Sequence, residues 1–567
     1  MPTALEPILT DPFLTKIQKE REAGFAYQKR RHEMWDENYT LYRDTVQINR
    51  LTQRQSVNIP LMKETIKTLL AEMDEAPDVV FEELDNDLEK EYVLNEYWSW
   101  NMDELNFEGM DMQDKKNVLL YGRSFMKLNF FDNKFDAEVL DIYDILVDPK
   151  TNPLNIESAK YLIHQNIFRS LKEILADEKY DEKAKEKLKE HFLFGEGLVI
   201  GDKNREALEV KKERMALMGS EDFADIDKLL AGGDTVISLS EYYTTEFEDD
   251  KFIRYVAVLA EDNIVLYKEP LEKALGVDFW PFTTWAEDLE VSDIWSDGEA
   301  DVVRTINKVL NAWFSQTIEN RSYRNFGMRF FDATKGAFNP KSWTPEPWGF
   351  YPVPGNPNDI LKEIEIPGLS DNLVEMEFLV RLAEKATATP AVEKGVMEKK
   401  QATFGEIGTI LAQAKERVKG TAKFYKRARK EFAQKWYAII EANSEESETI
   451  TLFKKSHKGR NFAKKVKASD WKSKAGYKIK VSSSSEQDTE TATNFQKLML
   501  VGQKFPDNAA LQRVVQKRMI ELADLTPDEI KEIMDFEKNK PPMQMTPMPN
   551  NKQLLNLKET VGRALVT

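Results

Sequence analysis

Three clusters of carboxylates are the residues of this chain whose types and spacing best suit chemistry. Convergent Asp and Glu side chains are what a two-metal nuclease needs, because carboxylate oxygens hold both ions. The clusters are Glu82, Glu83, Asp85 and Asp87; Glu246, Glu248, Asp249 and Asp250; and Glu287, Asp288, Glu290 and Asp293. The second cluster lies between two runs of β-branched and aromatic residues, as a hairpin turn does. We therefore predict no metal site here, and a metal-dependent nucleic-acid-processing enzyme remains the alternative reading of these residues.

Motifs for other kinds of catalysis do not occur in the sequence. The four histidines, His32, His164, His191 and His457, are far apart and form no HExxH pair. The chain has no GxxxxGK[ST] phosphate loop and no GxSxG nucleophile elbow. It has no cysteine, which excludes disulfides and thiolate zinc sites. We therefore expect a protein that is not an enzyme and that uses no cofactor.

Length and composition predict a soluble protein of several domains. The chain has 567 residues, of which 41% are hydrophobic and 31% charged. No apolar run reaches the roughly 18 residues that a membrane-spanning helix needs. The first residues lack the basic start and apolar stretch of a secretory signal. We expect no membrane partner.

The net charge of −18 is unevenly spread along the chain. Residues 393–435 carry 12 Lys or Arg and 5 Asp or Glu, and residues 454–480 carry 11 Lys or Arg against Asp470 alone. These two segments hold local charges of +7 and +10, which leaves −35 on the remainder. An overall acidic chain is not typical of a nucleic-acid-binding protein. The basic segments are suited either to a local polyanion contact or to the acidic surface of another subunit.

The elements that must position these residues are mixed. Helices are predicted over 10–43, from Pro60 to before Pro77, and over 87–105, and residues 119–149 form an island of short strands that ends at Asp148-Pro149. Ser170 and Glu173 form a capping-box pattern at the start of a short helix. Residues 235–267 alternate β-branched or aromatic runs with acidic turns, which predicts an antiparallel meander.

The second half of the chain is mainly helical by its periodicity. An apolar stripe over 298–318 predicts one helix, and a longer stripe over 403–441 predicts the longest helix, packed against others. The break between helices at 388–402 contains Pro390 and Gly395. Residues 449–481 indicate basic strands. The fold class that follows is α+β and predominantly helical.

The order of these elements resembles the portal proteins, the head-to-tail connectors of tailed bacteriophages. YGRSFMKLNF and AEVLDIYDILVDP resemble a portal strand pair that ends in Asp-Pro and leads to SAKYLIHQNIFRSLKEIL. SEYYTTEF resembles the clip module, and WSDGEADVVRTINKVLNAW is similar to the stem helix that leaves the clip. ATPAVEKGVMEKKQATFGEIGTILAQAKERVKG resembles the tunnel loop that leads into the long wing helix. The resemblance covers most of the chain and rests on organisation rather than on an invariant signature.

The resemblance implies a portal-type architecture of wing, stem helices, small β clip and helical crown. The expected parts are a wing formed by 1–203 and 326–481, a stem helix over 204–232 towards the clip, the clip over 233–295, a stem helix over 296–325 leaving it, a tunnel loop over 388–402, a long helix over 403–441, and a helical crown with a flexible tail over 482–567.

The resemblance also implies a function and partners. A ring of this chain, usually of twelve subunits, would occupy one capsid vertex of a virion and pass double-stranded DNA during genome packaging and ejection. It would join head to tail and contact the terminase, the major capsid protein and tail adaptor proteins, after assembly in the host bacterial cytoplasm. The terminase would supply the ATPase, in agreement with the lack of a phosphate loop here. A ring-forming structural protein outside phages is a further alternative.

Two sets of candidate site residues follow. The charged residues expected nearest to DNA, on the tunnel loop, are Glu393, Lys394, Glu398, Lys399 and Lys400. The residues of the expected basic interface segment are Lys454, Lys455, Lys464, Lys465 and Lys467. An ordinary helix–helix turn with solvated charges is the simpler reading of the first set, and we expect a protein contact rather than a DNA contact for the second.

Overall fold

The structure is a computed structural model of the whole chain, and part of the chain is described. The described residues are 12–43, 48–49, 54–55, 58–73, 78–85, 87–131, 134–193, 236–248, 250–261, 263–325, 329–331, 361–363, 372–387, 404–445, 449–455, 461–482 and 499.

Two antiparallel sheets form the β part of the body. The larger has the order β10-β9-β8-β7-β6, with β6 (Ile145–Val147), β7 (Tyr161–Ser170), β8 (Val236–Glu248), β9 (Lys251–Ala260) and β10 (Ile264–Pro270). The smaller has the order β11-β4-β5, with β4 (Arg123–Phe131), β5 (Lys134–Val139) and β11 (Phe282–Ala286). With the helices described below, these sheets confirm an α+β fold.

The predicted meander is present, but it is not a separate module. Strands β8, β9 and β10 pair in sequence order, and β8 also pairs with β7 along its length, from Tyr161 opposite Thr244 to Ser170 opposite Val236. One continuous sheet therefore crosses the expected boundary between a wing over 1–203 and a clip over 233–295. The edge of β7 that faces away from β6 has backbone N–H and C=O groups that need hydrogen-bond partners, and β8 supplies them.

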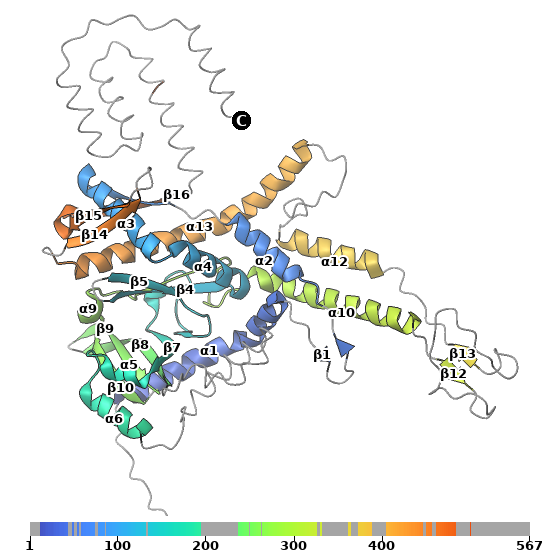
Figure 1. Ribbon diagram of the computed structural model, residues 1–567, viewed down its shortest axis with the longest axis horizontal. Coiled ribbons are helices and arrows are strands. Elements are labelled where there is room, and N and C mark those ends of the chain that lie inside the picture. Colours follow the sequence, from blue (N-terminus) through green and yellow to red (C-terminus); the bar gives the residue numbers. More distant parts are fainter. Residues whose placement is uncertain are drawn as a thin grey trace, which may run out of the picture.

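Helix α1 (Pro12–Arg43) lies along the large sheet, and α4 (Phe107–Tyr121) leads into the small sheet (Figure 1). The amide of Gln28 on α1 donates to the carbonyl oxygens of Ile142 and Ile145, at 2.7 and 2.8 Å. The island of strands predicted from Leu119 begins four residues later, at Arg123, since Leu119 to Tyr121 are the last residues of α4 and Gly122 follows them. The shorter helices are α2 (Leu61–Glu72), α3 (Leu88–Glu104), α5 (Leu171–Ala176), α6 (Glu182–Leu193) and α9 (Leu271–Leu275).

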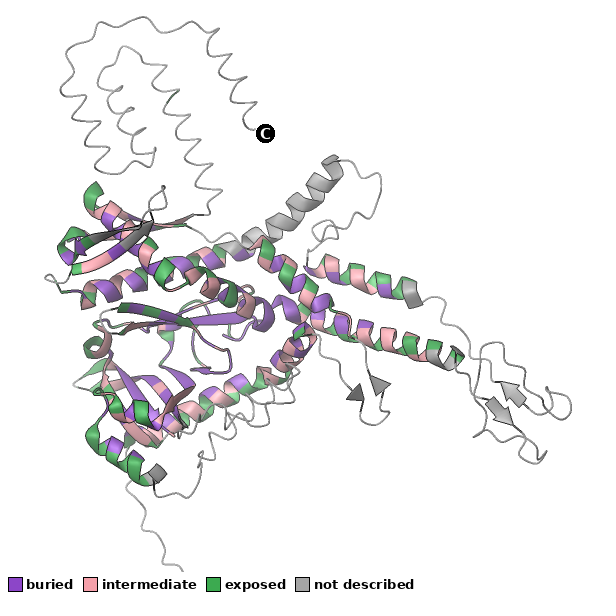
Figure 2. Cartoon of the chain, in the orientation of Figure 1, coloured by how far each residue is buried: buried purple, intermediate pink, exposed green. Residues whose placement is uncertain are grey.

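The largest apolar core joins α1, α2, α4, both sheets and the start of α10 (Glu299–Asn325), around the fully buried Trp35. A second core gathers α3, β4, β5 and the C-terminal half of α13 (Phe404–Asn443) around Trp436. The buried residues of these two cores are concentrated in the sheets and in the helices that surround them (Figure 2). Helix α13 matches the helix predicted over 403–441 closely.

Helix α10 and α12 (Asn372–Thr387) pack side by side and extend away from the sheets (Figure 1). The short strands β12 (Arg329–Phe331) and β13 (Leu361–Glu363) pair with each other beyond the far ends of both helices. The helix predicted over 296–325 is confirmed in α10. The helix predicted over 204–232 lies outside the described residues.

The basic strands predicted at 449–481 are confirmed. β14 (Thr449–Lys455) and β15 (Asn461–Lys467) form a hairpin, and β16 (Tyr477–Ser482) pairs with β3 (Asp78–Glu83). The predicted crown over 482–567 lies almost entirely outside the described residues. Among the helices of the described part, none combines the length and the hydropathy that crossing a membrane requires.

Candidate functional site: the root of the paired helices

The residues predicted for DNA and subunit contacts are only partly described. The tunnel-loop residues Glu393, Lys394, Glu398, Lys399 and Lys400 lie outside the described residues. In the basic segment, Lys454 and Lys455 lie on β14, and Lys464, Lys465 and Lys467 lie on β15. Lys465 and Lys467 are exposed on one side of the hairpin, and Val466 between them is buried. The strand period therefore presents at least these two ammonium groups on one face.

The carboxylate clusters support local structure. Asp87 caps α3 by accepting from the backbone N–H groups of Glu89 and Lys90, and Glu82 forms an ion pair with Lys480 across the β3–β16 pair. Glu248 accepts from the Tyr255 hydroxyl at 2.8 Å, and Glu246 forms an ion pair with Lys268 at 2.9 Å. Among the described residues, no group of three His, Asp or Glu side chains is placed to hold a metal ion.

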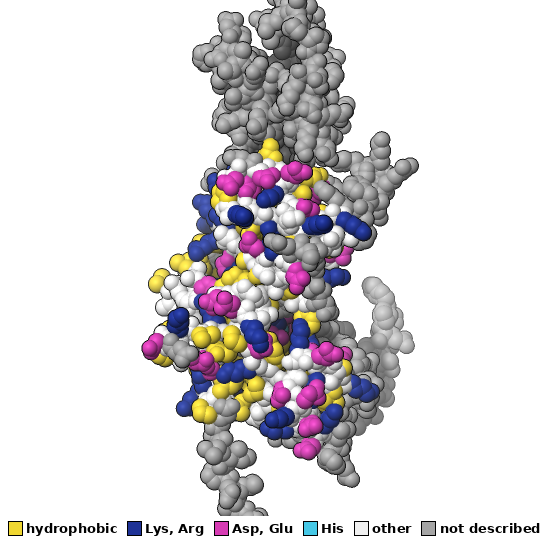
Figure 3. Space-filling view, turned by 90° about the vertical axis from the view of Figure 1, so that its left-hand side faces the viewer, with side chains coloured by type: hydrophobic (Ala, Val, Ile, Leu, Met, Phe, Trp, Pro, Cys, Tyr) yellow, Lys and Arg dark blue, Asp and Glu magenta, His cyan; other side chains and the backbone are white. Residues whose placement is uncertain are grey.

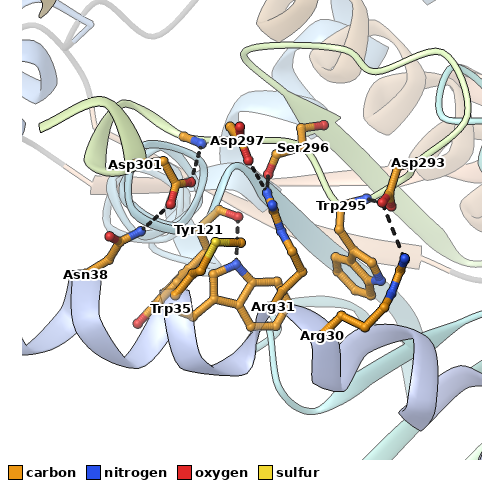
Figure 4. A network of polar contacts seen from close by, with 12 residues as sticks. Arg30, Arg31, Trp35, Asn38, Tyr121, Asp293, Trp295, Ser296, Asp297 and Asp301 are labelled. Atoms are coloured by element: carbon orange, nitrogen blue, oxygen red, sulfur yellow. Dashed lines mark hydrogen bonds and ion pairs between the residues drawn. The ribbon is translucent and has the colours of Figure 1, made fainter. Parts of the chain in front are cut away.

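The third cluster has a role at the base of α10. Asp293 accepts from the hydroxyl of Tyr27 on α1 at 2.6 Å. It also lies 3.4 Å from Arg30 (Figure 4). The Tyr27 hydroxyl in turn accepts from the backbone N–H of Ile294 at 3.1 Å. Burial, together with the bond to Asp293, raises the pKa of Tyr27 to about 12. The loop before α10 is thus held against α1 by a neutral phenol and a carboxylate.

Further polar contacts fix the first turn of α10. The guanidinium of Arg31 donates to the Ser296 carbonyl oxygen at 2.6 Å and forms an ion pair with Asp297. Asp301 accepts from the backbone N–H of Gly298 at 3.0 Å and from the amide of Asn38 at 3.1 Å (Figure 4). A carboxylate at the N-terminus of a helix also interacts favourably with the helix dipole.

Two glycines allow the loop and α4 to touch. Gly122 ends α4 with φ of 85°, and a Cβ there would lie 2.0 Å from the Ser296 carbonyl oxygen. A Cβ on Gly298 would lie 2.8 Å from the Gly122 nitrogen and from two carbonyl oxygens of α4. Distances below 3.0 Å leave no room for any side chain, so both positions require glycine.

A buried charge cluster fastens α13 to α4. Asp111 on α4 forms ion pairs with Arg429 on α13 and, at 2.6 Å, with Lys115. Asp114 lies 3.2 Å from Arg429 and accepts from the indole N–H of Trp285 at 2.7 Å. Burial acts to raise the pKa of Asp111, but Arg429 and Lys115 outweigh it and lower that pKa, whereas burial of Asp114 prevails and raises its pKa.

A buried lysine makes a second link six residues further along α13. The Lys435 ammonium donates to the carbonyl oxygens of Trp280 and Phe282, at 3.0 and 2.6 Å, and to the Glu157 carboxylate at 2.8 Å. Since an unpaired buried charge is strongly unfavourable, these contacts hold α13 against β11, the residues just before it and the turn that contains Glu157.

Together, these contacts form a site that holds two long helices in fixed positions on the body. The α10 helix is fixed at its first turn to α1 and α4, and α13 is fixed to α4 and β11 along its buried half. Sequence reasoning missed this junction, although the two glycines in YGR (121–123) and SDG (296–298) were a visible signal of close backbone approach.

The comparisons with known proteins bear on the whole chain. A family model described as "Phage SU10 portal protein" matches residues 45–560. A search of curated proteins finds no match. A solved structure described as "Neck of empty GTA particle computed with C6 symmetry" aligns at 10% sequence identity with a TM-score of 0.37, covering 81% of this chain and 90% of that chain. A structural similarity with so low a TM-score supports no conclusion about this chain. The family match, in contrast, spans nearly all of the sequence. The chain belongs to the phage SU10 portal protein family.

Proposed function

We propose that this portal protein works as a ring at one vertex of a phage-like particle, where it joins head to tail and lets double-stranded DNA pass. The family match over residues 45–560 carries this proposal. The fixed junctions of α10 and α13 support it, because a connector must keep its shape while DNA moves and pressure builds. Twelve is the number of subunits expected from the resemblance to portal proteins.

The paired helices α10 and α12 fit the stem, and the segment between them, with the β12–β13 hairpin, fits the clip. Both helices extend from the body towards the same side, with opposite chain directions, and the β12–β13 strand pair lies beyond their far ends (Figure 1). This assignment replaces the clip expected at 233–295, whose strands belong to the sheet of the body. The wing then comprises the two sheets, α1 to α6 and the buried half of α13.

The tunnel loop remains assigned to 388–402, between α12 and α13. In this proposal the loop follows the stem in the chain and precedes the long helix. Glu393, Lys394, Glu398, Lys399 and Lys400 give the loop both signs of charge. Mixed charge guides a polyanion without strong retention, since binding strengthens with each phosphate that Lys or Arg neutralises.

The charges on the surface of the body suit a protein that does not bind DNA tightly. On the face shown in Figure 3, Lys and Arg side chains alternate with Asp and Glu, with hydrophobic side chains between them. The whole chain carries −18, so DNA is repelled rather than bound at most points. The basic hairpin of Lys454, Lys455, Lys464, Lys465 and Lys467 is proposed to contact protein, either a neighbouring subunit or the capsid.

The partners proposed for the assembled ring are the terminase, the major capsid protein and tail adaptor proteins, within the virion and after assembly in the host cytoplasm. The terminase supplies ATP hydrolysis in this scheme.

Electron microscopy of the purified full chain tests the proposal. A closed ring with a central hole is the expected result, and mass photometry of the same sample gives the number of subunits. Monomers under all salt and protein concentrations would overturn the ring. A magnesium-dependent nuclease activity that is lost when Asp249 and Asp250 are changed to Asn would instead support a nucleic-acid enzyme.

A further inference from the structure

Helix α12 has two apolar faces, and only one of them is covered in the subunit. Met376 and Ala383 are buried in the largest core, with Leu379 and Val380 packed beside them. On the opposite side of the helix, the exposed apolar residues are Val374 (69% exposed), Phe378 (65%) and Leu382 (41%). These three are spaced by four residues, so they form one stripe along the helix.

Helix α10 has an outward face of a different kind. Its buried positions include Val303 and Leu310, with Phe314 packed beside them. The side turned away from these residues carries Val302, Thr305, Ala312 and Gln316, all exposed, and the half-buried Val309. None of these five residues is charged and Ala312 is small, so this side forms a smooth strip beside the ion-paired Lys308.

Both outward faces lie outside the core that the helix pair shares with the body. In each helix, the exposed residues lie roughly 100–160° around the helix axis from the nearest residues that pack inward. The bulky stripe of α12 and the smooth strip of α10 are therefore both left outside the core of their own subunit.

We propose that the α12 stripe of one subunit packs on the α10 strip of the next subunit in the ring. This inference rests on the proposed ring and assigns the surface that closes it. A ring needs a head-to-tail contact between two different, complementary surfaces of the same chain. The bulky side chains Val374, Phe378 and Leu382 fill a strip whose residues leave room for them, and both surfaces run along the same axis.

Charges at the far end of the helices favour the same pairing. Glu375 and Glu377 are exposed in the first turns of α12, and Arg321 and Arg324 are exposed in the last turns of α10. Because α10 and α12 run in opposite directions, parallel stems in a ring bring the start of α12 beside the end of the neighbour's α10. The occupant of the stripe is therefore a second copy of this chain.

Cysteine pairs test the contact directly, because the native chain contains no cysteine. The variant Ala312→Cys/Phe378→Cys is treated with a bis-maleimide long enough to tolerate a register error of two helical turns, roughly 10 Å. We expect a ladder of covalent oligomers in denaturing gels. Each single-cysteine variant should give no ladder, since the proposed contact joins unlike positions. Rings that stay intact without any ladder, or a crosslink confined to the monomer band, would overturn the inference.

A matched pair of charge substitutions separates this contact from the ring itself. Leu382→Glu and Leu88→Glu each place a carboxylate at a leucine that is 41% exposed and helical. Leu382→Glu should raise the protein concentration needed for rings by roughly tenfold or more, and Leu88→Glu should leave it unchanged. If the native chain forms no ring, the proposed function fails. If it forms rings and both variants assemble alike, only the assigned surface fails.

Discussion

The ammonium of Lys127 on β4 lies 2.7 Å from the carboxylate of Glu241 on β8, and this ion pair joins the two sheets of the body. Lys127 is buried, and its other neighbours are His164, at 3.3 Å from Nζ to Nδ1, and Glu138, at 3.4 Å. The Tyr243 hydroxyl donates to the same Glu241 carboxylate at 2.9 Å. The two sheets are thus linked by an ion pair in which each charge compensates the other.

Glu241→Gln should destabilise the protein by about 3 kcal/mol at neutral pH, since it leaves a buried ammonium without its closest counter-charge. Urea unfolding followed by tryptophan fluorescence measures this. Glu82→Gln is the control, because its partner Lys480 is 54% exposed and exposed pairs contribute only about 0–1 kcal/mol. Equal losses in the two variants would contradict the special role of the buried pair.

The stability from this pair should depend on pH. Burial acts to raise the pKa of Glu241, but Lys127 and His164 outweigh it and lower that pKa from 4.5 to about 2. A lowered folded-state pKa contributes stability that is complete above pH 4.5 and is lost as the pH falls towards 2. The difference in unfolding free energy between the native chain and Glu241→Gln should therefore be constant from pH 7 to 5 and shrink below pH 4.5. A difference that grows on acidification would reverse the assignment of the charged state.

Gly122→Ala should disturb the root of α10 and weaken the attachment of this helix to the body. The φ of 85° disfavours alanine by about 1–2 kcal/mol, and contact with the Ser296 carbonyl oxygen forces a further backbone shift. Gly476→Ala is the matched control, because its φ is also positive, at 82°, but a Cβ there meets nothing within 4 Å. Urea midpoints should fall clearly further for Gly122→Ala. Limited proteolysis of the α10 region should rise only in that variant.

Arg429→Ala should destabilise the chain by about 3–5 kcal/mol, because it leaves Asp111 buried with Lys115 alone as a cationic partner. Arg427→Ala on the same helix is the control, since Arg427 is exposed and donates only to the Leu154 carbonyl oxygen, at 3.3 Å. Thermal unfolding of both variants measures the difference. A smaller effect at Arg429 than at Arg427 would mean that α13 is held by its apolar contacts alone.

Local signals in the sequence predicted local structure well. The capping box of Ser170 and Glu173 is present, and α1, α10 and α13 begin and end within a few residues of their expected positions. Helix α4 was not predicted, because Asp111, Asp114 and Lys115 interrupt its inward face. Those residues form the buried charge cluster with Arg429, which no periodicity can reveal. A polar residue turned inward has the same sequence signature as one turned to solvent.

Long-range pairing was the harder part. The strands β8 to β10 carry the pattern of a meander, but nothing in that pattern states that β8 also pairs with β7. For this reason the pattern alone predicted a separate module over 233–295, whereas these strands continue the sheet of β6 and β7. The family itself was accessible from the order of elements, since the match to the portal model covers residues 45–560.

Neutralising the tunnel loop should change DNA packaging while leaving rings intact. The variant is Lys394→Gln/Lys399→Gln/Lys400→Gln, which removes three positive charges from the break between α12 and α13. Fewer ammonium groups near the DNA weaken its guidance through the channel, so the yield of filled heads should fall when the variant replaces the native chain.

The control for this variant removes the same charge elsewhere. Lys183, Lys187 and Lys189 are exposed on α6, at the surface of the body, and their replacement by Gln should leave both rings and packaging unchanged. Electron microscopy of purified rings establishes assembly, and the length of encapsidated DNA measures packaging. Packaging that is unchanged in the loop variant, with rings intact, would remove the assignment of 388–402 as the loop nearest to DNA. A loss of packaging in the α6 variant as well would mean that total charge, rather than the loop, controls the passage of DNA.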